Sequence, residues 1–361
     1  MSVSTPYHRL AREHPDHAWW KLPVAGVIGV AGYGVAVVCL VLVGVIAVLI
    51  ASDGDLEAVD SWLDGAGSTT LGSPGELAFL LIFIGLMLPA VVLGVLATGP
   101  RPVGYLSSVE GRLRWGWLAR LSAVAFLVYT AMILGSLAMG LGGEITAPSL
   151  ENDAVAVFLV ALLLTPTQAA AEEYVFRGYL LQLIGSWTRW AIIPVLVSTP
   201  LFVAGHVYEF WGLVDVGVFG LLACWLVIRT GGLEAAIAAH VANNVVLSTL
   251  EAFNMFALTS DEYGAVDVLP TVVTSILFAL LVEWMVRRSG LQRTRPPLPP
   301  KPPPPPVWIP AYPHPYPYPY PPQAYPPVHP GYYPYPSPPQ AHPPAPAPSY
   351  PPVPPPPGGT P

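Results

Sequence analysis

The sequence predicts an all-α protein, a polytopic membrane helix bundle of about eight transmembrane helices with a disordered proline-rich C-terminal tail. Of its 361 residues, 53% are hydrophobic and only 10% are charged, and the mean hydropathy is +0.55. This composition is typical of proteins that cross a membrane several times. The apolar residues form continuous runs near the length a helix needs to cross about 30 Å of hydrocarbon. The C-terminal part is different, because only 12 of the 46 prolines precede Arg295.

The apolar runs define the spans and the domain organisation. Continuous runs favour helices, because the strands of a membrane barrel would alternate apolar and polar residues. The first run is too long for the apolar region of a signal peptide, so we expect a retained span. We predict a cytoplasmic N-terminal segment at 1–23, a transmembrane bundle at 24–290 and a tail at 291–361. The predicted spans are 24–51, 77–98, 118–141, 153–184, 190–207, 212–229, 232–250 and 268–286.

The charges between these runs predict the orientation. All 15 basic residues fall before the first span, after the last one, or at every second junction in between. The intervening loops carry only acidic residues. Basic residues favour the cytoplasmic side, so we expect a multi-pass cell-membrane protein with both termini in the cytoplasm. The acidic, Ala/Val-rich composition and the proline tail indicate a bacterial origin.

The tail has no hydrophobic pattern, and proline both fixes φ and removes a backbone donor. We therefore expect disorder with local polyproline-II structure. Its Tyr/Pro repeats could bind a partner with an aromatic groove, or the tail could be a solvated appendage that the chemistry does not need.

Several functions are disfavoured by composition. The net charge of −7 argues against a nucleic-acid partner. Cys39 and Cys224 both lie in apolar runs, where they are expected to be buried apolar residues rather than a disulfide or a metal site. The sequence contains no CxxC and no HExxH motif.

One stretch carries charge inside an apolar span. Residues 168–178 read QAAAEEYVFRG and include Glu172, Glu173 and Arg177. Charge at membrane depth costs about 2.5–3.5 kcal/mol per residue on insertion scales. On a helix, Glu173 and Arg177 are four apart and share a face, whereas Glu172 points about 100° away and has no built-in partner. An unpartnered carboxylate in an apolar site is a candidate general base, although headgroup-level charges at a helix end would also fit.

Two further stretches place polar residues in predicted spans. FVAGH puts Phe202 and His206 one turn apart, and HVANN puts His240 and Asn244 on one helix face. Each residue alone could be a packing or interhelical bonding residue. Glu172 and His206 lie 17 residues before and after Arg189, so an antiparallel helix pair would bring them to similar depth. We expect Glu172, His206, His240 and Asn244 to converge in one buried layer.

These groups allow two chemistries. A carboxylate and an imidazole can activate a water, while an imidazole and an amide stabilise an oxyanion, which together permit amide hydrolysis. Alternatively, Glu172, His206 and His240 could bind zinc with a water as the fourth ligand. The residues leave both open, so the cofactor is none or Zn.

The motifs EEYVFRG, FVAGH and HVANN resemble, in this order, those of the CPBP family of membrane proteases, which includes CAAX-type prenyl endopeptidases and abortive-infection-type proteins. The resemblance covers about 150–250 and implies a protease core at about 118–286. It implies that Glu172 and His206 activate water and that His240 and Asn244 hold the oxyanion, with Glu173, Arg177 and Phe202 supporting them. The implied substrate is a membrane-associated protein or peptide. Of the two mechanisms we favour the glutamate-dependent, metal-free one, because none of the motifs is an HExxH-type zinc signature.

Two other classes of function remain possible from sequence. A catalytically idle scaffold or immunity protein would not need both His206 and His240. A transporter would be expected to show a repeat of its polar site in the two halves of the chain, and none is visible.

Overall fold

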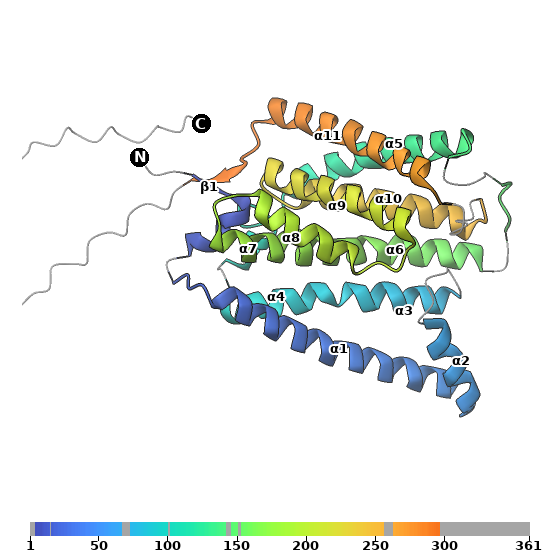
Figure 1. Cartoon of the computed structure of the whole chain (residues 1–361). Coiled ribbons are helices and arrows are strands. Elements are labelled where there is room, and N and C mark those ends of the chain that lie inside the picture. Colours follow the sequence, from blue (N-terminus) through green and yellow to red (C-terminus); the bar gives the residue numbers. More distant parts are fainter. Residues whose placement is uncertain are drawn as a thin grey trace, which may run out of the picture. The chain divides into compact units, whose positions relative to one another are not determined.

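The computed structural model describes residues 4–14, 16–66, 73–99, 102–141, 146–150, 153–255 and 263–296. The predicted tail lies outside these residues from position 297 onward. The described residues confirm the all-α class, since their strands are limited to a two-residue antiparallel pair, β1 (Thr5–Pro6) with β2 (Thr294–Arg295) (Figure 1). The long helices are α1 (Lys21–Ala51), α3 (Pro74–Gly85), α4 (Met87–Thr98), α5 (Trp115–Ala138), α6 (Ala154–Glu172), α9 (Phe210–Thr230), α10 (Glu234–Ala252) and α11 (Leu269–Ser289).

Shorter elements connect them. A π-helix, η3 (Glu173–Leu180), continues α6 directly and leads into α7 (Leu181–Trp187). The others are α2 (Leu56–Ala66), α8 (Ile192–Val203) and the 3₁₀ turns η1 (Tyr7–Glu13), η2 (Val103–Leu106) and η5 (Ala265–Val268). In Figure 1, α2 lies at the opposite end of the bundle from the β1–β2 pair.

Six helical segments of the described chain are long and apolar enough to cross a membrane, which makes this a multi-pass membrane protein. They are 21–51, 74–98, 115–138, 154–187, 210–230 and 265–289. Two of the eight predicted spans are not among them. The span predicted at 190–207 is the 12-residue α8, too short to cross 30 Å of hydrocarbon at 1.5 Å per residue.

The span predicted at 232–250 corresponds to α10, which is long but too polar to be counted with the six. Its residues from Glu234 to His240 are all buried, and it packs against α5, α6 and α9. A helix surrounded by other helices does not need an apolar face towards lipid, so α10 can carry polar side chains. Two of the four candidate site residues, His240 and Asn244, lie on this central helix.

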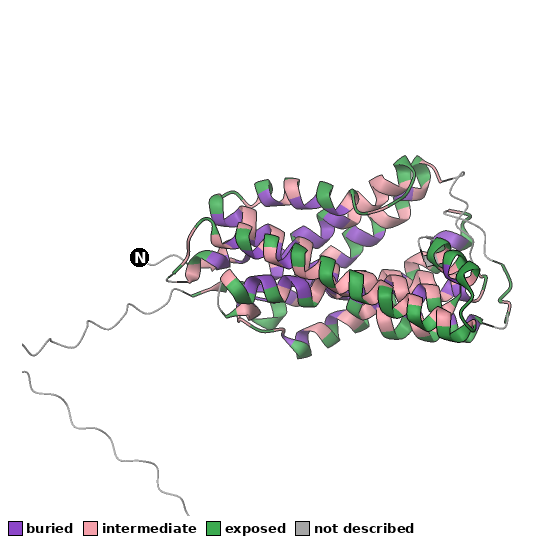
Figure 2. Cartoon of the chain, turned by 90° about the horizontal axis from the view of Figure 1, so that it is seen from below, coloured by how far each residue is buried: buried purple, intermediate pink, exposed green. Residues whose placement is uncertain are grey.

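The outer part of the bundle is α1 packed against α4. In Figure 2 the residues of α1 are mostly exposed or half-buried, and only Leu22, Ala25 and Gly29 are buried. A Cβ at Gly94 would lie 2.1 Å from the carbonyl oxygen of Ala25, so the two backbones can approach only because Gly94 has no side chain. Small residues at helix contacts are the usual means of close packing in membranes.

The N-terminal segment is part of the bundle and not only a polar leader. Tyr7 and Leu10 of η1 are fully buried, and η1 packs against α7. The Tyr7 hydroxyl donates to the carbonyl of Leu106. Together with the β1–β2 pair, this ties the beginning of the chain to residues 294–295 at the end of its described part.

Candidate active site

The two adjacent glutamates lie where α6 changes into the π-helix. Glu172 is the last residue of α6, and Glu173 is the first residue of η3. A π-helix widens the turn, is rarely more than a local bulge and is found frequently at functional sites. The backbone angles at the junction are ordinary, with φ −63° and ψ −44° at Glu172 and φ −62° and ψ −39° at Glu173, so the two side chains leave the helix about 100° apart.

Glu173 and Arg177 form the ion pair expected from their spacing. An Arg177 guanidinium nitrogen lies 3.0 Å from Oε1 of Glu173, and both side chains are completely buried. The guanidinium carbon also lies 4.0 Å above the centre of the Phe202 ring, a cation–π contact. Removing one partner of a buried ion pair strongly destabilises the folded protein, so we expect the pairing of Glu173 with Arg177 to be important for stability.

His240 lies between the two carboxylates. Its Nδ1 is 2.8 Å from Oε1 of Glu173, and its Nε2 is 3.3 Å from Oε2 of Glu172. Both carboxylate oxygens are acceptors when ionised, so a neutral imidazole can satisfy only one of them. The shorter contact, from Nδ1 to Glu173, is a hydrogen bond, and the longer one places Nε2 beside Glu172.

Glu172 has partners that the sequence interpretation missed, and the expectation that it has none was wrong. Its Oε2 accepts a hydrogen bond of 2.8 Å from Nε2 of Gln168, one turn earlier on α6. Gln168 in turn accepts a 3.4 Å contact from Nδ2 of Asn244. Asn243 donates to Oδ1 of Asn244 at 3.1 Å. The i,i+4 spacing of Gln168 and Glu172 was the available signal for this contact.

His206 is not on a helix, contrary to the expectation of a continuous span. Pro200 lies inside α8, and the helix ends at Val203. His206 follows in a turn, where its Nδ1 lies 2.9 Å from the Phe202 carbonyl oxygen. A carbonyl only accepts, so Nδ1 is the donor, and in the neutral ring Nε2 is left as a free acceptor.

Phe202 connects the two histidines. Its ring centre lies 4.7 Å from that of His206 and 6.0 Å from that of His240. It also packs edge-on against Phe176 at 5.3 Å, while Ser198 donates a 2.6 Å hydrogen bond to the carbonyl of Phe176. These contacts pair α8 with η3. The described hydrogen bond of His206 goes to Phe202 and not to Glu172.

The donor set does not fit a zinc site in this arrangement. Among the described residues, no group of three His, Cys, Asp or Glu side chains is placed to hold one metal ion. Glu172 and His240 are neighbours, but Nδ1 of His240 faces Glu173 and His206 is not joined to them. A catalytic zinc normally has three protein ligands.

Comparison with known proteins supports the motif assignment. Residues 152–246 match the family described as type II CAAX prenyl endopeptidase Rce1-like, which confirms the resemblance found in the three motifs. The uncharacterized protein YyaK of Bacillus subtilis (strain 168) is 29% identical over 150 residues, covering 36% of this chain and 48% of YyaK. The chain thus spans about half the length of this curated relative. No solved structure matches the chain.

Proposed function

We propose that the protein is an intramembrane endopeptidase that hydrolyses a peptide bond within or near the membrane with an activated water. The observation that carries the proposal is the placement of His240 between Glu172 and Glu173, 3.3 and 2.8 Å from their oxygens, inside an apolar bundle. The match of residues 152–246 to a family of endopeptidases supports the same reaction class.

Glu172 is the proposed general base. Its side chain is the less buried of the two carboxylates, at 12% exposure against 0% for Glu173. Glu173 contacts Arg177 and His240, whereas Glu172 accepts one hydrogen bond, from the neutral amide of Gln168, and lies 3.3 Å from Nε2 of His240. Glu172 is therefore the carboxylate that can accept a proton from water. His206, with Nε2 free as an acceptor, would assist it.

His240 and Asn244 are the proposed oxyanion donors. Glu173 orients the His240 ring through Nδ1, so Nε2 points towards Glu172 and the reacting atoms. Donors that are already oriented cost no reorganisation when negative charge develops on the carbonyl oxygen. Asn244 lies one turn further along α10, held by Gln168 and Asn243. The proton that Glu172 takes from the water would finally pass to the leaving amine, which restores the Glu172 carboxylate.

The substrate class follows from the location of the site. A bundle of spanning helices admits a peptide that is itself membrane-associated, and a CAAX-type prenylated C-terminus is the substrate named by the matching family. We propose the reaction without a metal cofactor, because the described side chains do not supply three ligands to one ion. The zinc-dependent version of the protease is the alternative.

The proposal is tested by purified full-length protein and a quenched-fluorescence peptide reporter in detergent or nanodiscs. We expect cleavage by the wild type and none by Glu172→Gln at unchanged thermal stability. Equal background cleavage by both proteins would overturn the proposal and leave a non-catalytic scaffold. The matched control is Glu251→Gln, which removes a carboxylate near the end of α10, outside the three motifs.

A further inference from the structure

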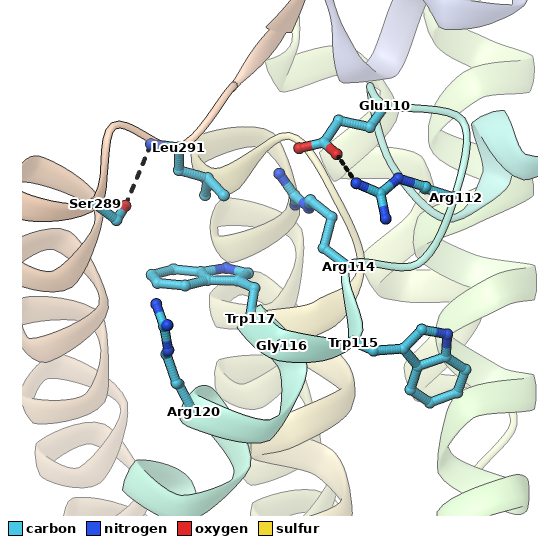
Figure 3. A pocket seen from close by; sticks show the side chains of 9 residues that line it. All are labelled: Glu110, Arg112, Arg114, Trp115, Gly116, Trp117, Arg120, Ser289 and Leu291. Carbon is cyan, nitrogen blue, oxygen red and sulfur yellow. Dashed lines mark hydrogen bonds and ion pairs between the residues drawn. The ribbon is translucent and has the colours of Figure 1, made fainter. Parts of the chain in front are cut away.

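A second polar site lies at the beginning of α5. A pocket of about 310 Å³ opens there between the first turns of α5 and the end of α11. Figure 3 shows Trp117 and Arg120 of α5 facing Ser289 and Leu291, with Arg114 above them. The volume is at the lower end of the range for small-molecule sites. None of the residues named for catalysis lines it.

The charges of this pocket are not balanced. Arg114 is neutralised by Glu234, with two charge-assisted contacts of 2.8 and 2.6 Å between buried side chains. Arg112 is paired with Glu110 at 3.1 Å. Arg120 has neither a carboxylate nor a hydrogen-bond partner among the residues that the structure describes. The lining therefore has an excess of one positive charge.

The helix terminus adds to this excess. The 24-residue α5 starts at Trp115 with no acidic residue in its first turn. The amides of Trp117 and Leu118 donate to the Arg114 carbonyl, whereas those of Trp115 and Gly116 have no acceptor among the described residues, and the helix dipole places partial positive charge there. The indole N–H of Trp117 is also without a partner in the described structure, although the side chain is only 7% exposed. Arg120 and the Trp117 indole thus line the pocket without a described partner, while the Glu110 carboxylate there is paired with Arg112.

We infer that this pocket binds the phosphate of an anionic phospholipid headgroup. A phosphodiester carries one negative charge and free oxygen acceptors, which complement Arg120, the α5 amides and the Trp117 indole. The pocket lies at the end of two spanning helices, α5 and α11, on the side that the loop charges predict to be cytoplasmic. Trp115, at the rim of the pocket, is 71% exposed, as an aromatic residue at a membrane interface is. Basic pockets between helix ends are known lipid-headgroup sites.

The acyl chains have a path beside the pocket. Along α11, Ile276, Leu280 and Trp284 are exposed apolar side chains that continue towards the other end of the bundle. A soluble phosphate would make no apolar contacts with these side chains, whereas the acyl chains of a phospholipid would cover them. The surface thus favours a lipid over a free anion.

The test is native mass spectrometry of the detergent-solubilised full chain with phosphatidylglycerol, phosphatidylcholine or inorganic phosphate added. We expect phosphatidylglycerol to be retained over phosphatidylcholine, and its occupancy to fall about fivefold in Arg120→Gln, the effect of one interfacial basic residue. Arg120 is exposed, so the variant should fold, and Arg120→Lys should restore binding. The control is Arg189→Gln, an exposed arginine over Trp190 outside the pocket, which should bind as the wild type does.

Three results would overturn the inference. Equal losses in Arg120→Gln and Arg189→Gln would indicate diffuse attraction of anionic lipid to the basic side. Equal retention of phosphatidylcholine would show that the phosphate charge is not recognised. Displacement of phosphatidylglycerol by an equal concentration of inorganic phosphate would make the ligand a soluble anion.

Discussion

The Nδ1 atom of His240 lies 2.8 Å from Oε1 of Glu173, the same oxygen that Arg177 contacts at 3.0 Å. One completely buried oxygen therefore fixes a cation and an imidazole ring at the same time. Because these contacts occupy Glu173, we expect it to position His240 and Glu172 to carry the proton transfer of the proposed mechanism. The adjacent glutamates are thus expected to respond differently to the same substitution.

The first prediction compares Glu172→Gln with Glu173→Gln. Glu172→Gln should lower turnover by about 10²–10⁴, the usual contribution of a general base, with little change in melting temperature. Glu173→Gln should lower the free energy of unfolding by about 3–5 kcal/mol, because it leaves Arg177 as an unpaired buried charge. Turnover of a peptide reporter and thermal unfolding in detergent measure the two effects. Full activity in Glu172→Gln would remove Glu172 from the mechanism.

The second prediction concerns Gln168, which joins Glu172 to Asn244. Gln168→Leu should lower kcat more than it raises KM, because it releases Glu172 without removing a substrate contact. Gln182→Leu is the matched control, since the Gln182 amide is also buried and donates to the Tyr105 carbonyl at 2.7 Å. Both variants should lose about 1–3 kcal/mol of stability. Equal kcat values in the two variants would show that Gln168 has only a structural role.

The sequence was sufficient for the helical class, the membrane location and the three motifs, because hydropathy and i,i+4 spacing are local properties. It could not show that α10 is enclosed by α5, α6 and α9, since enclosure depends on the whole bundle. The sequence therefore predicted a span at 232–250, whereas α10 is too polar to be one of the six segments that could cross a membrane. The sequence interpretation also missed the early end of α8, although Pro200 and Gly205 are residues that typically end a helix.

The position of His240 was the least predictable feature of the site. Glu172 and Glu173 keep ordinary helical backbone angles and leave the helix about 100° apart. That one imidazole lies near both carboxylates depends on how α10 packs against α6, and local sequence patterns do not show this packing. Pairing of Glu173 with Arg177 was confirmed, whereas the expectation of an unpartnered Glu172 was wrong, because Gln168 on the same helix face donates to it.

The third prediction is the topology. The 15 basic residues lie on one predicted side, so reporter fusions at residue 60, in α2, and after residue 290 should report opposite compartments. The compartment of the second fusion should be the cytoplasm. A fusion at residue 189, between α7 and α8, should agree with the second one. The same compartment for residues 60 and 290 would contradict the predicted alternation of the loops.

The fourth prediction is a pH dependence of stability that arises at His8. Burial of this side chain, which is 3% exposed in η1, lowers the pKa of His8 from its ordinary value of 6.5. The unfolded chain then binds a proton at a higher pH than the folded chain does. Stability should be complete above about pH 6.5 and decline as the pH falls from there to the lower pKa of the folded state. The melting temperature of His8→Leu should lose this decline between pH 7 and 5, and an unchanged slope would contradict it.

The last prediction separates the metal-free mechanism from the zinc alternative. Asn244 is a poor zinc ligand but a good amide donor, so its loss tests the oxyanion role alone. Asn244→Ala should lower turnover by about 10²–10³, comparable to His240→Ala, because each removes one donor to the same oxygen. The double variant should cost less than the product of the single effects, since the two groups act together.

Asn243→Ala, which removes only the 3.1 Å contact to Asn244, is the milder control. Bound zinc, measured by elemental analysis, should not change in any of these variants. Near-wild-type turnover in Asn244→Ala, together with loss of zinc in His240→Ala, would favour the metalloprotease instead, because the imidazole would then act as a ligand and the amide would have no role.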